Sequence, residues 1–199
     1  METARYVIAV IALVSMPPGI LFWYFVHPFA HHWRKVGPAV TYTAVSVAMI
    51  LLGVGIYQLR EPLLRVDYGF NRWLAWLALA VYLLAVVVEI MCRRHLKLRV
   101  LVGLPELAAG GSPGVLLTEG IYGRVRHPRY LGITIALLAV ALFTNYLATY
   151  LLFGICLVLM WGLMLIEEKE LRERFGEQYK EYSRQVPRFI PRMTGRSPR

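Results

Sequence analysis

The sequence has few cysteines and few acidic residues, and both shortages limit the classes of protein to which the chain can belong. Cys92 and Cys156 are the two cysteines among 199 residues, and no CxxC spacing occurs. A disulfide framework and a cysteine metal site are therefore not predicted. Only 12 Asp and Glu stand against 22 Lys and Arg, and residues 133–166 contain no charged side chain at all. An uncharged run of that length is atypical of a soluble domain.

Long apolar segments are abundant instead. Apolar residues make up 58% of the chain, and the mean hydropathy is +0.53. A helix that crosses a bilayer needs about 20 such residues. The run from Tyr130 to Ile166 would extend ~55 Å as one helix, too long for a single crossing, so a turn is expected at Asn145. The sequence thus predicts one all-α integral membrane domain with five spans, near residues 6–26, 38–59, 73–92, 130–144 and 147–166.

The distribution of basic residues predicts how these spans are oriented. If the spans alternate, 18 of the 22 Lys and Arg fall on one side of the membrane. The positive-inside rule then places the N-terminus outside, and the connector 93–129 and the helical tail 167–199 in the cytoplasm. This asymmetry, with attraction to anionic lipid headgroups, explains the net charge of +10 without nucleic-acid binding. Interfacial anchoring also explains His27, His31 and His32 better than metal binding does.

Two features of the spans stand out from their apolar background. Pro17 and Pro18 interrupt the first span, where their missing N–H groups predict a kinked helix. At the fourth span, Pro128 fits the first position of a helix, after His127. Free amides and the positive end of that helix, with Arg126 and Arg129 beside them, would form an anion site. The alternative is that both arginines only anchor the helix among headgroups.

Glu167 and Glu168 close the uncharged run at the same membrane face. One of them pointing inward is a functional candidate, since a carboxylate near the membrane interior is costly. We expect Glu167 to point inward and Glu168 to face the tail. The alternative is that both are solvated and pair with basic residues of the next turns, Lys169, Arg172 and Arg174. With the hydroxyls and rings of Tyr122 and Tyr130 nearby, the groups suit a zwitterionic, partly aromatic ligand.

Together these motifs resemble the isoprenylcysteine carboxyl methyltransferase family, in the wider group that includes membrane phospholipid methyltransferases. The resemblance covers about residues 96–192, and it depends on several motifs occurring in order. They are Gly120-Ile121-Tyr122, Arg126-His127-Pro128-Arg129-Tyr130-Leu131-Gly132, Glu167-Glu168, Phe175-Gly176, Tyr179, Tyr182 and Val186-Pro187-Arg188-Phe189-Ile190-Pro191.

The resemblance implies methyl transfer from S-adenosylmethionine, held without a Rossmann fold, to a hydrophobic or lipid-like acceptor. It implies a cytoplasmic cofactor pocket over the last two spans, and catalytic roles for Tyr122, His127 and Glu167. The implied cofactor contacts are Gly114, Val115, Leu116, Leu117, Tyr122, His127, Pro128, Arg129, Tyr130 and Glu167.

One position departs from the family pattern. The resemblance predicts an Arg one helical turn before the inward Glu, to hold a substrate carboxylate, and this chain has Leu163 there. Arg172 or Arg174 can substitute, so both are candidate substrate-binding residues. A lipid amine or a small thiol is an open alternative as acceptor.

Two other functional classes remain possible from the sequence. Membrane sterol reductases, which bind NADPH, are similar near a His-Pro-x-Tyr motif. A non-enzymatic membrane scaffold is the third possibility. Neither the oligomeric state nor the acceptor follows from the residues.

Overall fold

The computed structural model describes residues 1–26, 28–29, 33, 35–94 and 115–191. Regular structure in these ranges is helical, apart from one isolated bridge between Asp67 and Tyr146. The histidine cluster at residues 27, 31 and 32, most of the connector and Gly114 lie outside the described residues. In chain order the helices are α1 (Glu2–Val26), α3 (Pro38–Gln58), α4 (Arg60–Leu63), α5 (Arg72–Arg93), the 3-10 helix η1 (Gly120–Gly123), α8 (Pro128–Thr144), α9 (Leu147–Phe175) and α10 (Glu177–Gln185).

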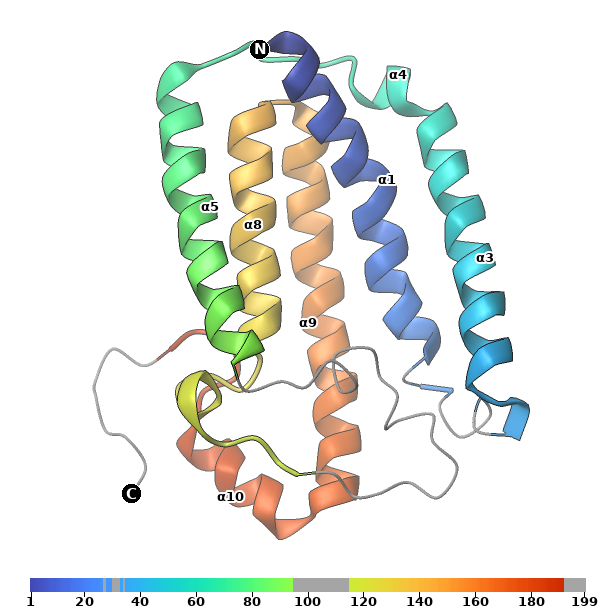
Figure 1. Cartoon of the computed structure of the whole chain (residues 1–199), viewed down its shortest axis with the longest axis vertical. Helices are drawn as coiled ribbons and strands as arrows, with labels where there is room; N and C mark the ends of the chain where they lie inside the picture. The colour runs from blue at the N-terminus through green and yellow to red at the C-terminus, as the bar shows by residue number, and fades with distance from the viewer. Residues whose placement is uncertain (27, 30–32, 34, 95–114, 192–199) are drawn as a thin grey trace.

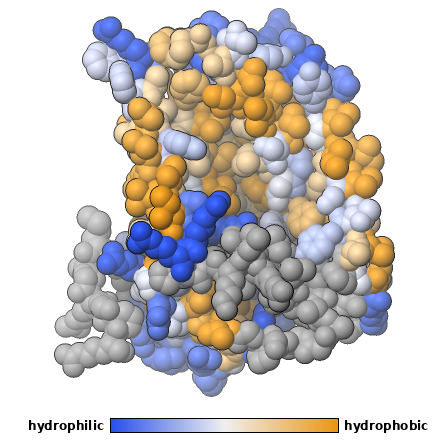
Figure 2. Space-filling model, viewed as in Figure 1, coloured by the Kyte–Doolittle hydropathy of each residue, from blue (hydrophilic) through white to orange (hydrophobic). Residues whose placement is uncertain are grey.

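Five long helices form a bundle, with α5 packed mainly on α8 and α3 on α1 (Figure 1). Four of them, α1, α3, α5 and α9, are long and apolar enough to cross a membrane. The fifth, α8, is apolar but has 17 residues, about 26 Å of helix. On the face shown in Figure 2, hydrophobic side chains cover the middle of the bundle and hydrophilic ones gather at its two ends. The predicted all-α integral membrane architecture is confirmed.

The α8–α9 turn and the start of α1 are tied together at the end of the bundle that carries α4. Asn145, the expected turn residue, has a φ of 54°. The side chain of Arg5 is fully buried beside it, where Nε and Nη2 donate to the carbonyl oxygen of Thr144 at 2.9 and 2.7 Å. Arg5 also pairs with Asp67. The hydrogen bonds to Thr144 fix the start of α1 against the turn, and the ion pair joins it to the segment between α4 and α5.

At the opposite end, which carries α10, α1 is tied to α9. The hydroxyl of Tyr24 donates to the carbonyl oxygen of Leu159 at 2.5 Å. Between these ties α1 runs as one helix from Glu2 to Val26 through Pro17 and Pro18. Both ends of α1 are therefore fixed to the α8–α9 pair, and its middle carries the weakened proline turn.

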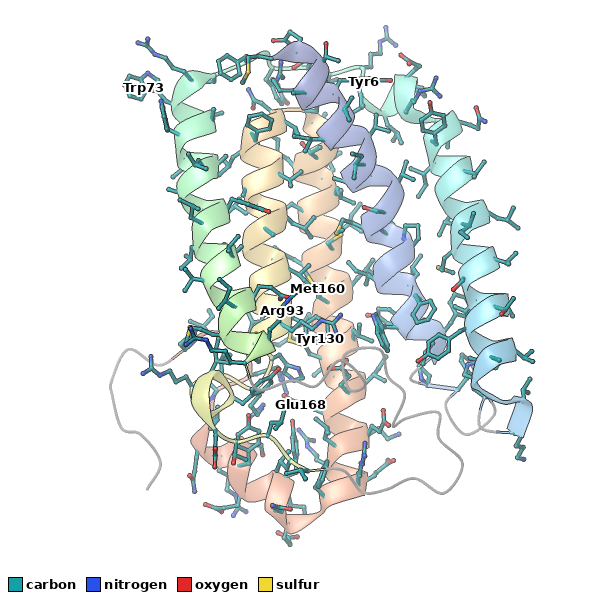
Figure 3. The ribbon with its side chains drawn as sticks, viewed as in Figure 1. Tyr6, Trp73, Arg93, Tyr130, Met160 and Glu168 are labelled. Atoms are coloured by element: carbon teal, nitrogen blue, oxygen red, sulfur yellow. The ribbon has the colours of Figure 1, made fainter. Side chains whose placement is uncertain are left out.

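α9 continues well past Ile166, where the sequence analysis ended the fifth span. It ends at Phe175, and Gly176, with a φ of 54°, turns the chain into α10. Figure 3 shows Tyr130 and Glu168 at this α10 end of the bundle, with Tyr6 and Trp73 at the other end. The charged tail is therefore two helices joined at Gly176, and the first is an extension of the span.

Candidate active site

The start of α8 carries a histidine held between two adjacent carboxylates. As the sequence predicts, α8 begins at Pro128, and His127 is its N-cap residue. The Nδ1 atom of His127 lies 3.5 Å from Glu167 Oε2, and Nε2 lies 3.3 Å from Glu168 Oε1. Burial would lower the pKa of His127, but the hydrogen bonds and negative charges of Glu167 and Glu168 together raise it above its usual value. The site therefore favours the imidazolium form.

Arg126 lines the cavity and also binds the tail. Its guanidinium donates to Glu168 Oε1, at 2.7 Å from Nη2. Nη1 donates to the carbonyl oxygens of Ser183 and Val186 at 2.6 and 2.9 Å. Arg126 therefore ties the tail to the start of α8, and its expected role beside an anion stays a prediction.

The two amides just before α8 are also occupied. The backbone N–H groups of Arg126 and His127 donate to the carbonyl oxygens of Pro187 and Arg188 at 2.9 and 3.0 Å. The segment 186–191, called here the C-terminal strap, thus runs beside the start of α8. These two amides are occupied, so an anion at this helix end has to use others.

Glu168 is the centre of a buried charge cluster rather than a surface group. Its side chain is 1% exposed. Arg188 forms two hydrogen bonds to it, Nε to Oε1 and Nη2 to Oε2, both 2.8 Å. Arg172 adds a contact of 3.3 Å from the next turn of α9. Glu168 lies on the tail side, as expected. No role was predicted for Arg188, whose only signal in the sequence is its place in the Val-Pro-Arg motif.

Glu167 points the other way, into a cavity. It is a lining residue of this cavity, whereas Glu168 is not. The hydroxyl of Tyr130, on α8, donates to Glu167 Oε1. A carboxylate is therefore presented at the cavity wall with one oxygen held by a phenol.

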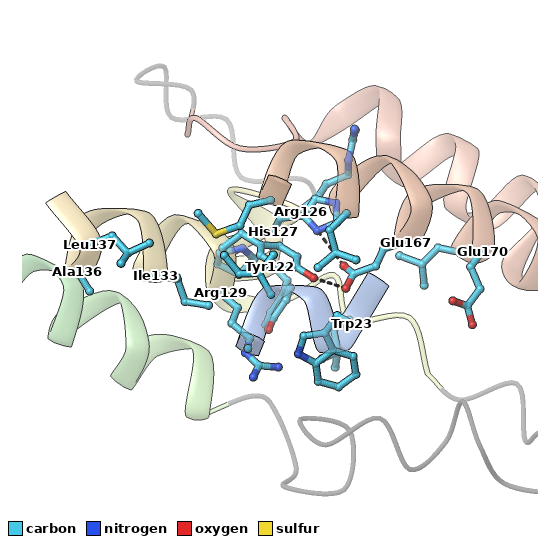
Figure 4. A pocket seen from close by; sticks show the side chains of 18 of the residues that line it. Trp23, Tyr122, Arg126, His127, Arg129, Ile133, Ala136, Leu137, Glu167 and Glu170 are labelled. Atoms are coloured by element: carbon cyan, nitrogen blue, oxygen red, sulfur yellow. Dashed lines mark hydrogen bonds and ion pairs between the residues drawn. The ribbon is translucent and has the colours of Figure 1, made fainter. Parts of the chain in front are cut away.

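The cavity lies between α1, α8 and α9 and has a volume of about 720 Å³. Its polar end collects basic, acidic and aromatic groups around the start of α8 (Figure 4). The polar and aromatic lining residues at that end are Trp23, Tyr122, Arg126, His127, Arg129, Tyr130, Glu167, Glu170, Arg174, Phe175, Tyr179 and Tyr182. Such a set can meet a ligand that carries charges of both signs and an aromatic ring.

Most candidate residues of the sequence analysis lie on this cavity. The predicted site residues that line it are Val115, Leu116, Leu117, Tyr122, His127, Pro128, Arg129, Tyr130, Glu167 and Arg174. Arg172 is different: it does not line the cavity and pairs with Glu168. Its expected role in substrate binding stays a prediction, and Arg174 is the one of the two that lines the cavity.

Tyr122 is placed at the cavity by a contact from the tail. The hydroxyl of Tyr182 donates to the carbonyl oxygen of Tyr122 at 2.7 Å. Burial raises the pKa of the Tyr122 phenol far above its usual value. The phenol stays protonated at neutral pH, so it acts as a hydrogen-bond donor rather than as a base.

One wall of the cavity was missed by the sequence analysis. Residues of α1 from Ile8 to Trp23 line it, opposite α8 and α9. The first span lies outside the residues that carry the family resemblance, and apolar lining residues carry no motif. The paired prolines were the single unusual feature of that span.

Comparison with known proteins gives one family and several relatives. The profile of the phospholipid methyltransferase family matches residues 73–178. The chain is 30% identical over 184 residues to methanethiol S-methyltransferase of Mycobacterium tuberculosis, which covers 82% of this chain and 69% of the relative. It is 28% identical over 178 residues to methanethiol S-methyltransferase 2 of Bradyrhizobium diazoefficiens, covering 84% of this chain and 66% of the relative.

A shorter similarity links the chain to an isoprenylcysteine methyltransferase. The chain is 36% identical over 78 residues to protein-S-isoprenylcysteine O-methyltransferase of Schizosaccharomyces pombe, covering 39% of this chain. That alignment spans only 33% of the yeast protein's length. No solved structure matches the chain.

Proposed function

The chain belongs to the phospholipid methyltransferase family, and on this premise we propose that it transfers a methyl group from S-adenosylmethionine to a hydrophobic or lipid-like acceptor. The observation that carries the proposal is the cavity of about 720 Å³. Its polar end gathers groups of both charges, and the rest of its lining is apolar. A charged cosubstrate and an apolar acceptor can therefore meet inside one cavity.

The residues at the polar end fit the cosubstrate chemically. S-adenosylmethionine supplies an electrophilic methyl on a sulfonium, which passes to the acceptor's nucleophilic atom while the carbon–sulfur electron pair stays on the leaving sulfur. Glu167 suits a ribose hydroxyl or an ammonium group, and Arg129 suits a carboxylate. Val115, Leu116 and Leu117 line the cavity and give an apolar edge for adenine.

The chain's own contribution is placement and exclusion of water. Tyr130 holds the Glu167 carboxylate in one orientation, and Glu168 anchors the ring of His127 from behind. Fixed partners of this kind bring two reactants together at little further entropic cost. The apolar lining keeps water from the reacting atoms. No covalent enzyme intermediate is required, and a proton from a neutral acceptor leaves to the polar end of the cavity.

The family resemblance predicts an arginine that binds the acceptor, and this chain has Leu163 at that position. Leu163 is 1% exposed and lines the cavity. Arg174, which also lines the cavity, is the remaining candidate for an acidic headgroup. Thiols and lipid amines, which need no such cation, fit the apolar position better.

We assign the polar end of the cavity to the cytoplasmic face, with the N-terminus outside. The support is the distribution of charge, since 18 of the 22 Lys and Arg fall on that side.

Calorimetric titration with S-adenosylhomocysteine tests the proposal. The expected result is micromolar binding to the detergent-purified protein, weakened about 10- to 100-fold in Glu167→Gln, since a hydrogen bond to a charged group contributes about 1.5–3 kcal/mol. Glu181→Gln, on the exposed side of α10, is the matched control. Absence of S-adenosylhomocysteine binding with binding of NADPH would replace the proposal by a reductase.

A further inference from the structure

A buried arginine lies at the end of the bundle opposite the candidate active site. Arg5 is near the start of α1, a helix apolar enough to cross a membrane, and its side chain is fully buried. A charged group in such a segment is costly, so it is a functional candidate by default. The carboxylates of Glu2 and Asp67 pair with Arg5, and its guanidinium lies 5.1 Å from the centre of the Tyr146 ring. These partners balance the charge but do not explain the direction in which the guanidinium points.

The guanidinium points to the last residue of α8. Nε and Nη2 both donate to the carbonyl oxygen of Thr144, at 2.9 and 2.7 Å, and α8 ends at Thr144. The final carbonyl groups of a helix have no partner inside the helix and carry the negative end of its dipole. Arg5 therefore caps α8 with a side chain that belongs to α1, whose start lies beside the α8–α9 turn (Figure 1). The same helix carries the candidate site at its other end.

α1 forms one wall of the cavity, and its lining residues begin just beyond Arg5. They run from Ile8, three residues and about 4.5 Å further along the helix, to Trp23. Pro17 and Pro18 lie inside this wall and remove backbone hydrogen bonds from the helix. The half of the wall that precedes the prolines is joined rigidly to Arg5. Its position therefore depends on the contact between Arg5 and the end of α8.

We propose that Arg5 is a positioning residue for methyl transfer. Its contact with Thr144 fixes how far the α1 wall lies from α8, and this sets the width of the cavity in which the two reactants meet. The proposal rests on the proposed function, because it assigns a further role in the same reaction. The groups that suit the cosubstrate, Arg129 and Glu167, lie on α8 and α9. Arg5 therefore affects the placement of the acceptor and leaves the affinity for the cosubstrate unchanged.

The contacts of Arg5 need a guanidinium and not simply a positive charge. Nε and Nη2 reach Thr144, Nη2 also reaches Asp67, and Nη1 reaches Glu2. A lysine keeps the charge but replaces this planar fork by a single ammonium group. Arg5→Lys therefore removes the two-nitrogen contact with α8 while a cation remains beside Asp67. Asp67→Asn keeps the contact with Thr144 and removes one counter-charge, so its effect should have the same direction and be smaller.

The first experiment measures kcat/KM for methanethiol and for octanethiol on each variant, together with the calorimetric affinity for S-adenosylhomocysteine. A misplacement of about 1 Å can lower a rate by about 100-fold. For both thiols we expect Arg5→Lys to lower kcat/KM about 10- to 100-fold, and Asp67→Asn to lower it by less than about 10-fold. The affinity for S-adenosylhomocysteine should stay at the wild-type value in both variants. A merely structural role would lower thermal stability without this separation of acceptor turnover from cosubstrate affinity.

Asn71→Ala is the matched control at the same end of the bundle. The Asn71 side chain caps α5 by accepting hydrogen bonds from the amides of Trp73 and Leu74, at 2.9 and 3.2 Å. α5 contributes no residue to the described lining of the cavity. Loss of the cap should lower the unfolding temperature by about 2–4 °C and leave kcat/KM unchanged. An equal fall of kcat/KM in Asn71→Ala and Arg5→Lys would assign the effect to lost stability and overturn the proposal.

A distance measurement tests the position of α1 without turnover. Spin labels are attached to cysteines introduced at Val7 on α1 and Ile155 on α9, which are 46% and 57% exposed. The two native cysteines are buried and are replaced by alanine. We expect Arg5→Lys to shift or broaden the distribution of label distances, and Asn71→Ala to match the wild type.

Unchanged distances, or unchanged kcat/KM, in both Arg5→Lys and Asp67→Asn would overturn the proposal. If Arg5→Lys does not fold, Asp67→Asn alone decides the outcome by the same two measurements. Failure of the proposed function is recognised separately, because the wild type then does not bind S-adenosylhomocysteine. The label distances still show in that case whether Arg5 positions α1.

Discussion

Arg188 and Glu168 form a bidentate ion pair, with both nitrogen–oxygen distances at 2.8 Å. The pair joins the C-terminal strap to α9, and the strap's carbonyl oxygens also accept hydrogen bonds from the amides of Arg126 and His127. A residue close to the end of the described chain thus fixes the start of α8 from two directions. The strap thus holds the start of α8 and α9 together beside the candidate site.

Replacing Arg188 should weaken the attachment of the strap to α9. In Arg188→Ala, Glu168 keeps Arg126 and Arg172 but loses its bidentate partner inside a buried site. We expect a destabilisation of about 1–3 kcal/mol, less than for a buried pair without other partners. Thermal unfolding in detergent measures it, against Arg184→Ala, whose side chain is 74% exposed and which should change stability by less than about 0.5 kcal/mol. Equal unfolding temperatures of the two variants would show that the strap contributes nothing.

Replacing Glu168 and replacing Glu167 should affect different properties of the protein. Glu168→Gln leaves Arg126 and Arg188 without their buried counter-charge, so we expect a destabilisation of about 3–5 kcal/mol. Glu167→Gln changes a cavity-wall group that is 21% exposed, so its main effect should be on S-adenosylhomocysteine affinity. Unfolding temperature and calorimetric affinity, measured on both variants, give the comparison. The assignment of roles is wrong if Glu167→Gln is the less stable protein.

The sequence predicts the helices well because each is encoded locally. Apolar runs and their interruptions placed the spans, and Asn145 was the expected turn because the apolar run that contains it is too long for one helix. The family and the inward orientation of Glu167 were also accessible, since the motifs of the last two spans occur in order. These features depend on residues close together in the chain.

The features that could not be predicted depend on contacts between residues that are far apart in the chain. Glu168 is buried because Arg126 and Arg188, separated from it by 42 and 20 residues, converge on it. The contribution of α1 to the cavity depends on where that helix packs, and Ile8 or Gly19 looks like any other membrane residue. The tail was expected to be helical, but its unbroken continuation from the fifth span to Phe175 was not predicted, because the hydropathy pattern ends at Ile166.

His127 should make stability depend on pH. Its pKa is raised in the folded protein because Glu167 and Glu168 outweigh the effect of burial. The stabilisation from the protonated ring is complete below the unfolded pKa of about 6.5, and it is lost as pH rises through the raised folded pKa. The unfolding temperature of the ligand-free protein should therefore fall over that range, and His127→Gln should remove this part of the dependence. If the difference in unfolding temperature between the wild type and His127→Gln stays constant with pH, the assignment to His127 is wrong.

The contact between Tyr24 and Gly162 should reverse the usual effect of an alanine in a helix. Glycine to alanine in an open helix position raises stability by up to about 1 kcal/mol, which is the expectation for Gly154→Ala, where a Cβ meets nothing within 4 Å. At Gly162 a Cβ would collide with the Tyr24 hydroxyl, whose hydrogen bond to Leu159 ties α1 to α9. Gly162→Ala should therefore lower the unfolding temperature.

Removing the hydroxyl provides the test of that cause. In a Tyr24→Phe background the nearest ring carbon is 3.5 Å from the added Cβ, an ordinary contact, and the hydrogen bond to Leu159 is already gone. Gly162→Ala should then be neutral or stabilising, so a double-mutant cycle gives a coupling of about 1 kcal/mol or more. If the alanine costs the same in both backgrounds, the hydroxyl is not what requires glycine at position 162. A positive coupling means that the Tyr24 hydroxyl, which ties α1 to α9 at the α10 end of the bundle, is what requires glycine at position 162.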